Sequence, residues 1–354
     1  MTLLFNLLML PVDLAALGLL RTARAPSVWL MAMCFAGAGA TTLSGLLGEN
    51  WFGVYRLEAY GRFLHGPILL AGSAALLWRN HRKTAWITAI GAAVVLAVAA
   101  DAFLVEPHWL EVSHVEIASP KLKRPVRIVV LADIQTDRIG AYEEGVLRLA
   151  LQQNPDLVLL AGDYLQPGMR VDDVWTEREQ QQQALNDLLR RLDFSAPLGV
   201  FAVQGNIELP QWEQMFGGLK VITASTSKSF DLGVLRLTCL GLSESYDTML
   251  RLPASEPGRF HIVLGHVPNF SLGHVEADLL LAGHTHGGQV RLPWIGPLST
   301  HCEIPHAWAA GLTELDGGRK LVVSRGIGME RDTAPRFRFL CRPELVVIDL
   351  VPAN

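Results

Sequence analysis

The chain has 354 residues, a length typical of two domains. Its net charge is −4 and it contains no run of Lys and Arg, which argues against a nucleic-acid-binding surface. The four cysteines show no Cys-x-x-Cys spacing, so they predict no disulfide framework and do not indicate the compartment.

The first hundred or so residues are almost uncharged and contain four apolar segments. These are Leu3–Leu20, Val28–Gly48, Phe63–Trp78 and Ala85–Val105. The second and fourth approach the roughly 20 residues that a helix needs to cross a bilayer, whereas the first contains Pro11 and Asp13 and the third is short. Tryptophans lie near the segment ends, where indoles are favoured at membrane interfaces. We expect residues 1–105 to form an all-α transmembrane region of about four helices, in preference to a hydrophobic soluble bundle.

Basic residues in the short loops indicate the orientation. The first and third loops carry five Lys or Arg and the second carries two: Arg21, Arg24, Arg79, Arg82 and Lys83 against Arg56 and Arg62. Because Lys and Arg favour the cytoplasmic side, four spans would then place the C-terminal domain outside the cytoplasm. A short basic stretch after the last segment, residues 121–124, argues the other way. In a bacterium, we expect a multi-pass protein of the cell inner membrane.

A charged connector, residues 106–125, precedes a domain that we expect to occupy residues 126–354. The expected strands are His114–Ala118, Val126–Ala132, Leu157–Ala161, Gly199–Val203, Leu235–Leu240, Phe260–Leu264, Leu279–Ala282, Lys320–Ser324 and Leu345–Leu350. The expected helices are Tyr142–Gln153 and Asp172–Leu192. Buried strands that alternate with helices are typical of an α/β layer architecture.

Polar residues lie just past the carboxyl ends of five of these strands. They are Asp133-Ile134-Gln135, Gly162-Asp163, Gly205-Asn206-Ile207-Glu208, Gly265-His266 and Gly283-His284-Thr285-His286. Ligands bind beyond the carboxyl ends of strands in open α/β sheets, and glycine permits a close backbone approach. In an extended chain His284 and His286 would point to one side, and imidazole is a common ligand of Zn, Mn and Fe. Five such strand ends in this order predict a dinuclear metal centre.

The same order of motifs resembles the calcineurin-like metallophosphoesterase family. Its pattern is Asp-x-His, Gly-Asp, Gly-Asn-His-Asp/Glu, a later His and Gly-His-x-His. The resemblance spans about Val126–Leu350 and includes Gly287–Pro293 and Val323–Gly328, while Arg342–Leu345 resembles the membrane-associated branch. It implies a sandwich of two mixed β-sheets flanked by helices. It also implies two divalent metal ions (Mn, Fe or Zn) and a phosphoester substrate.

The resemblance assigns four residues to each metal ion, with Asp163 shared between them. The first ion would take Asp133, Gln135, Asp163 and His286, and the second would take Asp163, Asn206, His266 and His284. Two such ions clamp a phosphate and lower the pKa of a bridging water, which gives a hydroxide that attacks phosphorus directly. Asp163, Asn206 and His284 are therefore expected to serve catalysis as well as metal binding.

Two positions depart from the family pattern. Gln135 stands where the family has a histidine, and an amide oxygen is a weaker ligand for borderline transition metals, although it suits Mn²⁺. Ile207 replaces a histidine that, in the family, lies beside the phosphate and is proposed to protonate the leaving group or to stabilise the transition state. General-acid assistance is worth about 10²–10⁴-fold, so we expect slow turnover, a good leaving group or a substitute donor. The substitutes that the sequence offers are Glu208, Tyr164, Asp137 and Arg325.

Some residues match no family position. His261, His274, His301 and His306 are expected to be surface or packing residues. The apolar loop Leu292–Leu298, which contains Trp294, has two readings: it enters the bilayer and admits a lipid substrate, or it packs within the domain. We expect it to pack within the domain.

The sequence thus predicts a membrane-anchored, metal-dependent phosphoesterase that hydrolyses a phosphodiester or pyrophosphate. A lipid or envelope-linked substrate is suggested by the anchor alone. The alternative is a catalytically weak or inactive family member that binds metal as a receptor or regulatory module. Gln135 and Ile207 are the features that favour this alternative.

Overall fold

The computed structural model describes residues 1–22, 26–167, 174–253 and 258–353. The chain divides into two compact units. One is helical and comprises Met1–Val105 with Thr333–Arg336, and the other comprises Glu106–Asp332 with Phe337–Asn354.

The helical unit contains the four predicted apolar segments. Its elements are α1 (Thr2–Thr22), α2 (Pro26–Leu47), α3 (Trp51–Tyr60), the π-helical turn η1 (Gly61–His65), α4 (Gly66–Leu77), α5 (Arg82–Ala100) and the π-helical turn η2 (Asp101–Val105). The predicted start of the third segment is wrong: α3, η1 and α4 follow one another without a break from Trp51. The first turns of this helix carry charged residues, so they do not show the apolar pattern used for the prediction. Two of these residues, Glu58 and Arg62, pair with each other one turn apart.

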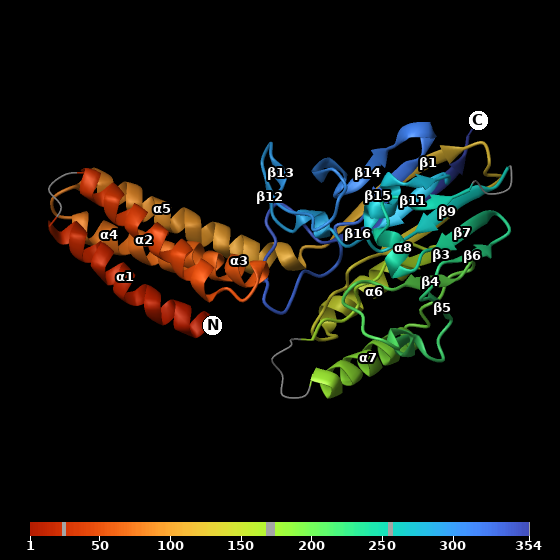
Figure 1. Cartoon of the computed structure of the whole chain (residues 1–354), viewed down its shortest axis with the longest axis horizontal. Coiled ribbons are helices and arrows are strands. Elements are labelled where there is room, and N and C mark those ends of the chain that lie inside the picture. Colours follow the sequence, from red (N-terminus) through yellow and green to blue (C-terminus); the bar gives the residue numbers. More distant parts are fainter. Residues whose placement is uncertain (23–25, 168–173, 254–257, 354) are drawn as a thin grey trace. The chain divides into compact units, whose positions relative to one another are not determined.

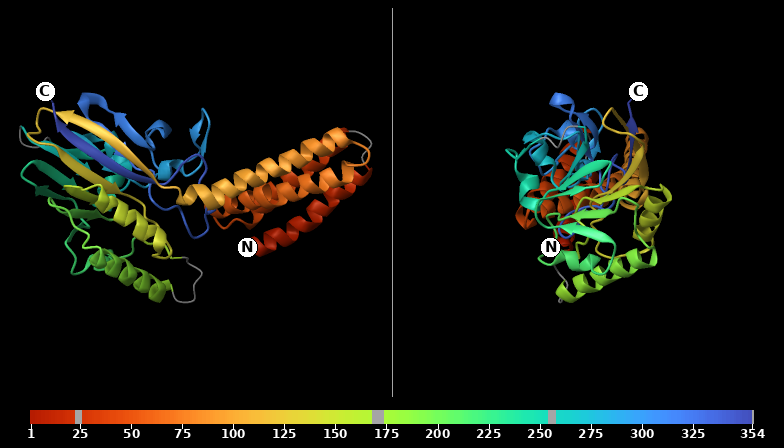
Figure 2. Two further views of the ribbon diagram at one scale, coloured as in Figure 1. Left: turned by 180° about the vertical axis from the view of Figure 1, so that it is seen from behind. Right: turned by 90° about the vertical axis from the view of Figure 1, so that its right-hand side faces the viewer.

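Side chains of the helical unit are apolar on the outside as well as inside. α1 packs against α2 and α4, and α4 packs against α5 (Figure 2). Leu3, Leu14 and Ile87 are nevertheless 73%, 69% and 68% exposed. The helices Thr2–Arg21 and Arg82–His108 are long and apolar enough to cross a membrane. Large apolar side chains therefore lie on the outer faces of these helices as well as between them.

The second unit is built on two six-stranded sheets (Figure 1). The first has the order β1 (Glu111–Ser119), β16 (Glu344–Pro352), β2 (Val126–Leu131), β3 (Leu157–Leu160), β4 (Val200–Val203) and β5 (Val221–Ala224). The second has the order β14 (Gly311–Glu314), β15 (Lys320–Val323), β11 (Leu279–Ala282), β9 (Phe260–Leu264), β7 (Leu235–Cys239) and β6 (Lys228–Asp231). Each sheet has a parallel centre and antiparallel pairs, β16–β2 in the first and β14–β15 and β6–β7 in the second. The predicted sandwich of mixed sheets is confirmed.

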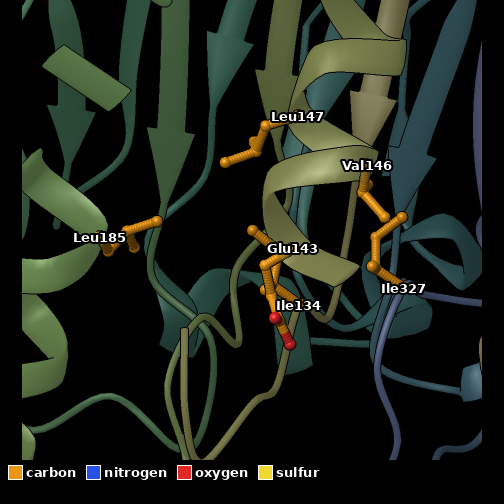
Figure 3. Close-up of a pocket in the computed structure, with 6 residues that line it drawn as sticks. All are labelled: Ile134, Glu143, Val146, Leu147, Leu185 and Ile327. Atoms are coloured by element: carbon orange, nitrogen blue, oxygen red, sulfur yellow. The ribbon is translucent and has the colours of Figure 1, made fainter. Parts of the chain in front are cut away.

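Successive side chains of the central strands point to opposite faces of the sheet and so pack into two different hydrophobic cores. In β2, Ile128 and Val130 join a core shared with strands of the other sheet, whereas Val129 and Leu131 belong to a second core. This second core lies beneath α6 (Ala141–Gln152) and α7 (Val174–Arg191), which cover the outer face of the first sheet (Figure 1). Figure 3 shows Val146, Leu147 and the carboxylate-bearing Glu143 of α6 and Leu185 of α7 around a small space, together with Ile134 and Ile327, and this space has no room for a water molecule. The helices therefore pack behind Ile134, the residue that follows Asp133.

The remaining elements are short. They are α8 (Leu242–Tyr246), the pairs β8 (Arg251–Leu252) with β10 (His274–Val275) and β12 (Arg291–Leu292) with β13 (Gly296–Pro297), and 3₁₀ turns at Glu106–His108, Trp212–Phe216, Pro268–Leu272, His286–Gly288, His306–Trp308 and Asp316–Gly318.

Several predictions about individual elements need correction. The edge strands β5, β6 and β14 were not predicted, because many of their side chains are polar or exposed and the apolar signature of a buried strand is missing. β1 begins at Glu111 within the expected connector and pairs in parallel with β16. The first two residues of the predicted helix Asp172–Leu192 lie outside the described residues.

The expectation that Leu292–Leu298 packs within its domain is wrong at the tip of the loop. This segment forms the β12–β13 hairpin, and its turn residues Trp294 and Ile295 are 102% and 69% exposed. Leu298, which follows the hairpin, is also exposed. Residues 294 and 295 form the turn between the two short strands, beyond the last paired residues, Leu292 and Gly296.

Candidate metal centre

The loops after β2, β3, β9 and β11 meet at the carboxyl ends of these strands. The Asp133 N–H donates to the Gly162 carbonyl at 3.0 Å, which joins the first two loops. The Gly283 N–H donates to the His266 carbonyl at 3.0 Å, which joins the last two. The His284 N–H donates to both carboxylate oxygens of Asp133 at 2.9 and 3.0 Å and so connects one sheet with the other. The sandwich thus brings distant sequence motifs to one site.

Five of the seven predicted ligands have a backbone φ in the left-handed region. The values are 49° for Asp133, 34° for Gln135, 54° for Asp163, 69° for His284 and 48° for His286. Such a conformation costs a non-glycine residue on the order of 1–3 kcal/mol and clusters at functional sites. The extended geometry expected for the two histidines is wrong, because a 3₁₀ turn begins at His286.

Four ligand atoms converge where the second metal ion was predicted. The Asn206 Oδ1 atom lies 2.9 Å from His266 Nε2 and 2.8 Å from His284 Nδ1. The Asp163 Oδ1 atom lies 3.3 Å from His266 Nε2. Ligand atoms of Asp163, His266 and His284 all lie within 4.8 Å of one another. This set of carboxylate, amide and imidazole groups fits a divalent transition metal.

Hydrogen bonds from the far side of each ring determine which nitrogen faces the site. His266 Nδ1 lies 2.7 Å from the Ala161 carbonyl oxygen, and His284 Nε2 lies 3.2 Å from the His301 carbonyl oxygen. A carbonyl oxygen only accepts, so these two nitrogens carry the hydrogen atoms. The opposite nitrogens, His266 Nε2 and His284 Nδ1, therefore face Asp163 and Asn206, and their lone pairs would be offered to a bound cation. Partners of this kind orient histidine ligands in metal sites.

Burial and mutual attraction set the charges of this group. Burial raises the pKa of Asp163, but His266 outweighs it and holds that pKa below its usual value. Burial lowers the pKa of His266, yet Asp163 and Asp133 raise it to about 9. Burial, together with His266, lowers the pKa of His284 to about 4. His284 is thus neutral, as a ligand must be, while a bound cation would replace the proton on His266.

The other predicted set contains two buried atoms that lack a partner. Gln135 Oε1 and His286 Nδ1 have no hydrogen bond among the described residues, although buried polar atoms almost always have one. Gly326, at φ 71°, lies between two members of this set. A Cβ atom there would lie 3.0 Å from Asp133 Oδ2 and 3.3 Å from His286 Nδ1. Glycine thus leaves open a small space faced by a carboxylate and an imidazole, which fits a cation.

A buried arginine supports this glycine loop. Arg338 is 0% exposed and donates to the carbonyl oxygens of Arg325, Gly326 and Gly328. The Gly328 N–H in turn donates to the Asp133 carbonyl at 2.7 Å. Arg338 was not identified from the sequence, where a single arginine in a loop carries no signal.

The four possible substitutes for the missing histidine have structural partners. Glu208 accepts hydrogen bonds from the backbone N–H groups of Asp163, Tyr164 and Gly205 at 2.7–3.0 Å. The Tyr164 hydroxyl donates to the Val203 carbonyl at 2.8 Å. Asp137 pairs with Arg331 at 3.5 Å, and Arg325 pairs with Glu111 and Glu344 at 3.1 Å. These contacts give each side chain a role in holding the loops around the site.

Ile207 contributes through its backbone. Its N–H donates to Asp163 Oδ1 at 3.1 Å, so the loop still orients that carboxylate although the side chain cannot transfer a proton.

An open groove of about 450 Å³ adjoins the site and was not foreseen. Its lining includes Tyr246, Asn269, His301 and His306. The ring centroids of Tyr246 and His284 are 6.1 Å apart, which places the groove next to the metal ligands. Its segment 299–306 shows no periodicity that would have revealed it. Of the other two unmatched histidines, His261 is buried and bonds Thr238, and His274 is exposed.

Comparison with known proteins identifies the class. Residues 126–288 match the model of the calcineurin-like phosphoesterase family. The chain is 29% identical over 267 residues to the phosphodiesterase YaeI of Escherichia coli (strain K12), which covers 70% of this chain and 90% of that protein. It is 27% identical over 270 residues to the metallophosphoesterase YkuE of Bacillus subtilis (strain 168), with 70% and 88% covered. The solved structure of Yfce, a phosphoesterase from E. coli, aligns with 17% identity and a TM-score of 0.32 over 58% of this chain and 82% of that one.

The chain therefore carries a calcineurin-like phosphoesterase domain and is a metallophosphoesterase. It belongs to a class of hydrolases that use divalent metal ions, and the predicted family and enzyme class are confirmed.

Proposed function

We propose that this protein is a membrane-anchored phosphodiesterase that uses two divalent metal ions. The observation that carries the proposal is the convergence of Asp163, Asn206, His266 and His284, with both imidazoles turned toward the shared space by carbonyl partners. The unpartnered atoms of Gln135 and His286 support the other ion. The phosphodiester class follows the name of the E. coli relative.

Each side chain has a role that follows from its contacts. Two bound divalent ions, Mn, Fe or Zn, would neutralise a phosphoryl group and lower the pKa of a water near Asp163. Asp163 serves both ions in this proposal, and the Ile207 N–H keeps its carboxylate in place. Asn206 supplies a neutral oxygen at the exposed side, so it adds no negative charge that would repel the substrate.

The groove beside His284 would hold the alcohol part of the substrate. Tyr246 offers a hydroxyl that is protonated at neutral pH and can donate to the leaving oxygen. Such a donor would offset part of the assistance lost at Ile207.

Replacing one histidine should show whether this protein is an enzyme or a protein that only binds metal. We expect His284→Ala to lower kcat on bis(p-nitrophenyl) phosphate with Mn²⁺ by at least about 100-fold, because a ligand near the reacting phosphorus is lost. His274→Ala, at an exposed position on β10, should leave kcat unchanged. Steady-state assays of the detergent-solubilised protein measure both. Equal activities of the two variants, or a wild type with no turnover on any phosphodiester, would favour the receptor or regulatory alternative.

The helical unit is proposed to cross the membrane four times, through α1, α2, the continuous helix of α3, η1 and α4, and α5. Arg56 lies in α3 and Arg62 in η1, so the segment between α2 and α3, residues 48–50, holds no Lys or Arg. The described basic residues Arg21, Arg79, Arg82 and Lys83 then lie on one side of the proposed membrane, and the fifth, Arg24, lies outside the described residues. Because Lys and Arg favour the cytoplasmic side, this distribution supports a catalytic unit on the non-cytoplasmic side.

Reporter fusions test this orientation. Alkaline phosphatase joined after Val105 should be active, and a fluorescent protein joined at the same place should be dark if the junction is outside. The reverse pattern would contradict the orientation.

An apolar hairpin suggests that the substrate is a lipid phosphodiester. Trp294 is fully exposed at the turn of β12–β13 and Ile295 beside it is 69% exposed, and tryptophan is favoured at membrane interfaces. A hairpin of this kind would hold the groove against the bilayer surface that contains the substrate.

Replacement of the hairpin tryptophan should affect lipid substrates alone. We expect Trp294→Ser to lower kcat/KM for phosphatidylglycerol vesicles about tenfold, which corresponds to the loss of about 1.4 kcal/mol of interfacial binding. Trp175→Ser provides the control, because Trp175 is also exposed (65%) but lies on α7. Turnover of bis(p-nitrophenyl) phosphate should stay unchanged in both variants. Equal losses on the two substrates would overturn the lipid proposal.

A further inference from the structure

The amide that replaces the family histidine is held on one side only. Gln135 is 0% exposed, and its Nε2 atom donates to Gln166 Oε1 at 2.9 Å and to Glu330 Oε2 at 3.0 Å. Its Oε1 atom has no hydrogen-bond partner in the described part of the chain. Both hydrogens of the Gln135 amide nitrogen are thus used in hydrogen bonds to the protein, while the amide oxygen accepts none in the described part of the chain.

The partners permit only this orientation of the amide. Gln166 Nε2 donates to Glu330 Oε1 at 2.8 Å, and the Arg331 N–H donates to Gln166 Oε1 at 2.8 Å. Because a backbone N–H only donates and a carboxylate only accepts, Gln166 must direct its oxygen toward Arg331 and its nitrogen toward Glu330. Both groups that face Gln135 are then acceptors. A flipped Gln135 would place its oxygen against two other oxygens.

The same segment also holds the backbone at this position. Arg331 Nε donates to the Gln135 carbonyl at 3.0 Å, and the Glu330 N–H donates to Gln289 Oε1 at 3.0 Å. Gln135 adopts a φ of 34°, a conformation that persists only where its surroundings impose it. Segment 330–331 therefore fixes both the backbone and the amide of residue 135.

We propose that Gln166 and Glu330 are positioning residues that turn the Gln135 oxygen toward the first metal ion and so favour Mn²⁺ over Zn²⁺ at that position. The inference rests on the proposed two-ion site and adds a selectivity to it. Carboxylate and carbonyl oxygens suit Mn²⁺, whereas imidazole suits Zn²⁺. A loop that fixes an amide in place of the imidazole thus shifts the donor set toward oxygen.

Metal titration tests the positioning role without reference to turnover. The detergent-solubilised full chain is stripped with EDTA, and Mn²⁺ and Zn²⁺ affinities are measured by calorimetry. We expect Glu330→Gln to weaken the lower-affinity Mn²⁺ site about 10–100-fold, the usual effect of losing a group that orients a ligand. Both oxygens of Glu330 accept hydrogen bonds, one from Gln135 and one from Gln166. The new amide at position 330 replaces one of these oxygens with an N–H donor, so Gln135 is no longer held. Glu213→Gln, at a half-buried glutamate that bonds Ser225, should bind Mn²⁺ as the wild type does.

A swap of the two partners distinguishes positioning from simple damage. In the double variant Glu330→Gln/Gln166→Glu, residue 166 accepts from Gln135, from the new amide and from the Arg331 N–H, so the acceptor pair is restored. We expect its Mn²⁺ affinity to return to within about threefold of the wild type, because paired changes in contact are not additive.

Restoring the family ligand should reverse the selectivity. Gln135→His is expected to raise the affinity of this position for Zn²⁺ relative to Mn²⁺ by at least about tenfold. Unchanged Mn²⁺ affinity in Glu330→Gln, or a loss that the swap does not repair, would overturn the proposal. Either result leaves the phosphodiesterase assignment intact, since that assignment is measured by turnover.

Discussion

The buried contact between Asp163 and His266, 3.3 Å between Oδ1 and Nε2, is the interaction on which the site depends. Asp163 follows β3 of one sheet and His266 follows β9 of the other, so the pair joins the two halves of the sandwich. Removing both groups from water is costly unless each gains good partners. The Ala161 carbonyl, the Ile207 N–H and Asn206 provide these partners, and the same contacts hold the ligand atoms of these residues around one space.

Backbone strain at the ligands is balanced by groups that never touch a metal. Glu208 gathers three N–H groups around Asp163, and Arg338 holds the carbonyl groups of the loop that contains Gly326. Both side chains are buried, and each would leave several backbone groups unsatisfied if removed. The site is therefore preorganised by its surroundings, which is the arrangement that catalysis by electrostatic stabilisation requires.

The strand ends could be predicted because each buried run stops at a glycine or a polar residue, and neighbouring parallel strands end at the same edge. The two-sheet arrangement was implied by the family resemblance and not by the pattern itself. Local pattern could not reveal the partners of Gln135, since Glu330 lies 195 residues away and no periodicity marks it. Three other features could not be predicted from local pattern either. The left-handed backbone of His284 and the exposure of Trp294 depend on the tertiary structure around them. The helix that starts at Trp51 contains charged residues that pair within the helix.

We propose that this chain holds two metal ions despite its two departures from the family pattern. Anomalous diffraction from crystals grown with Mn²⁺ would reveal both ions. We expect two peaks, one coordinated by Asp163, Asn206, His266 and His284 and one by Asp133, Gln135, Asp163 and His286. A single peak, or none at these residues, would contradict the proposal.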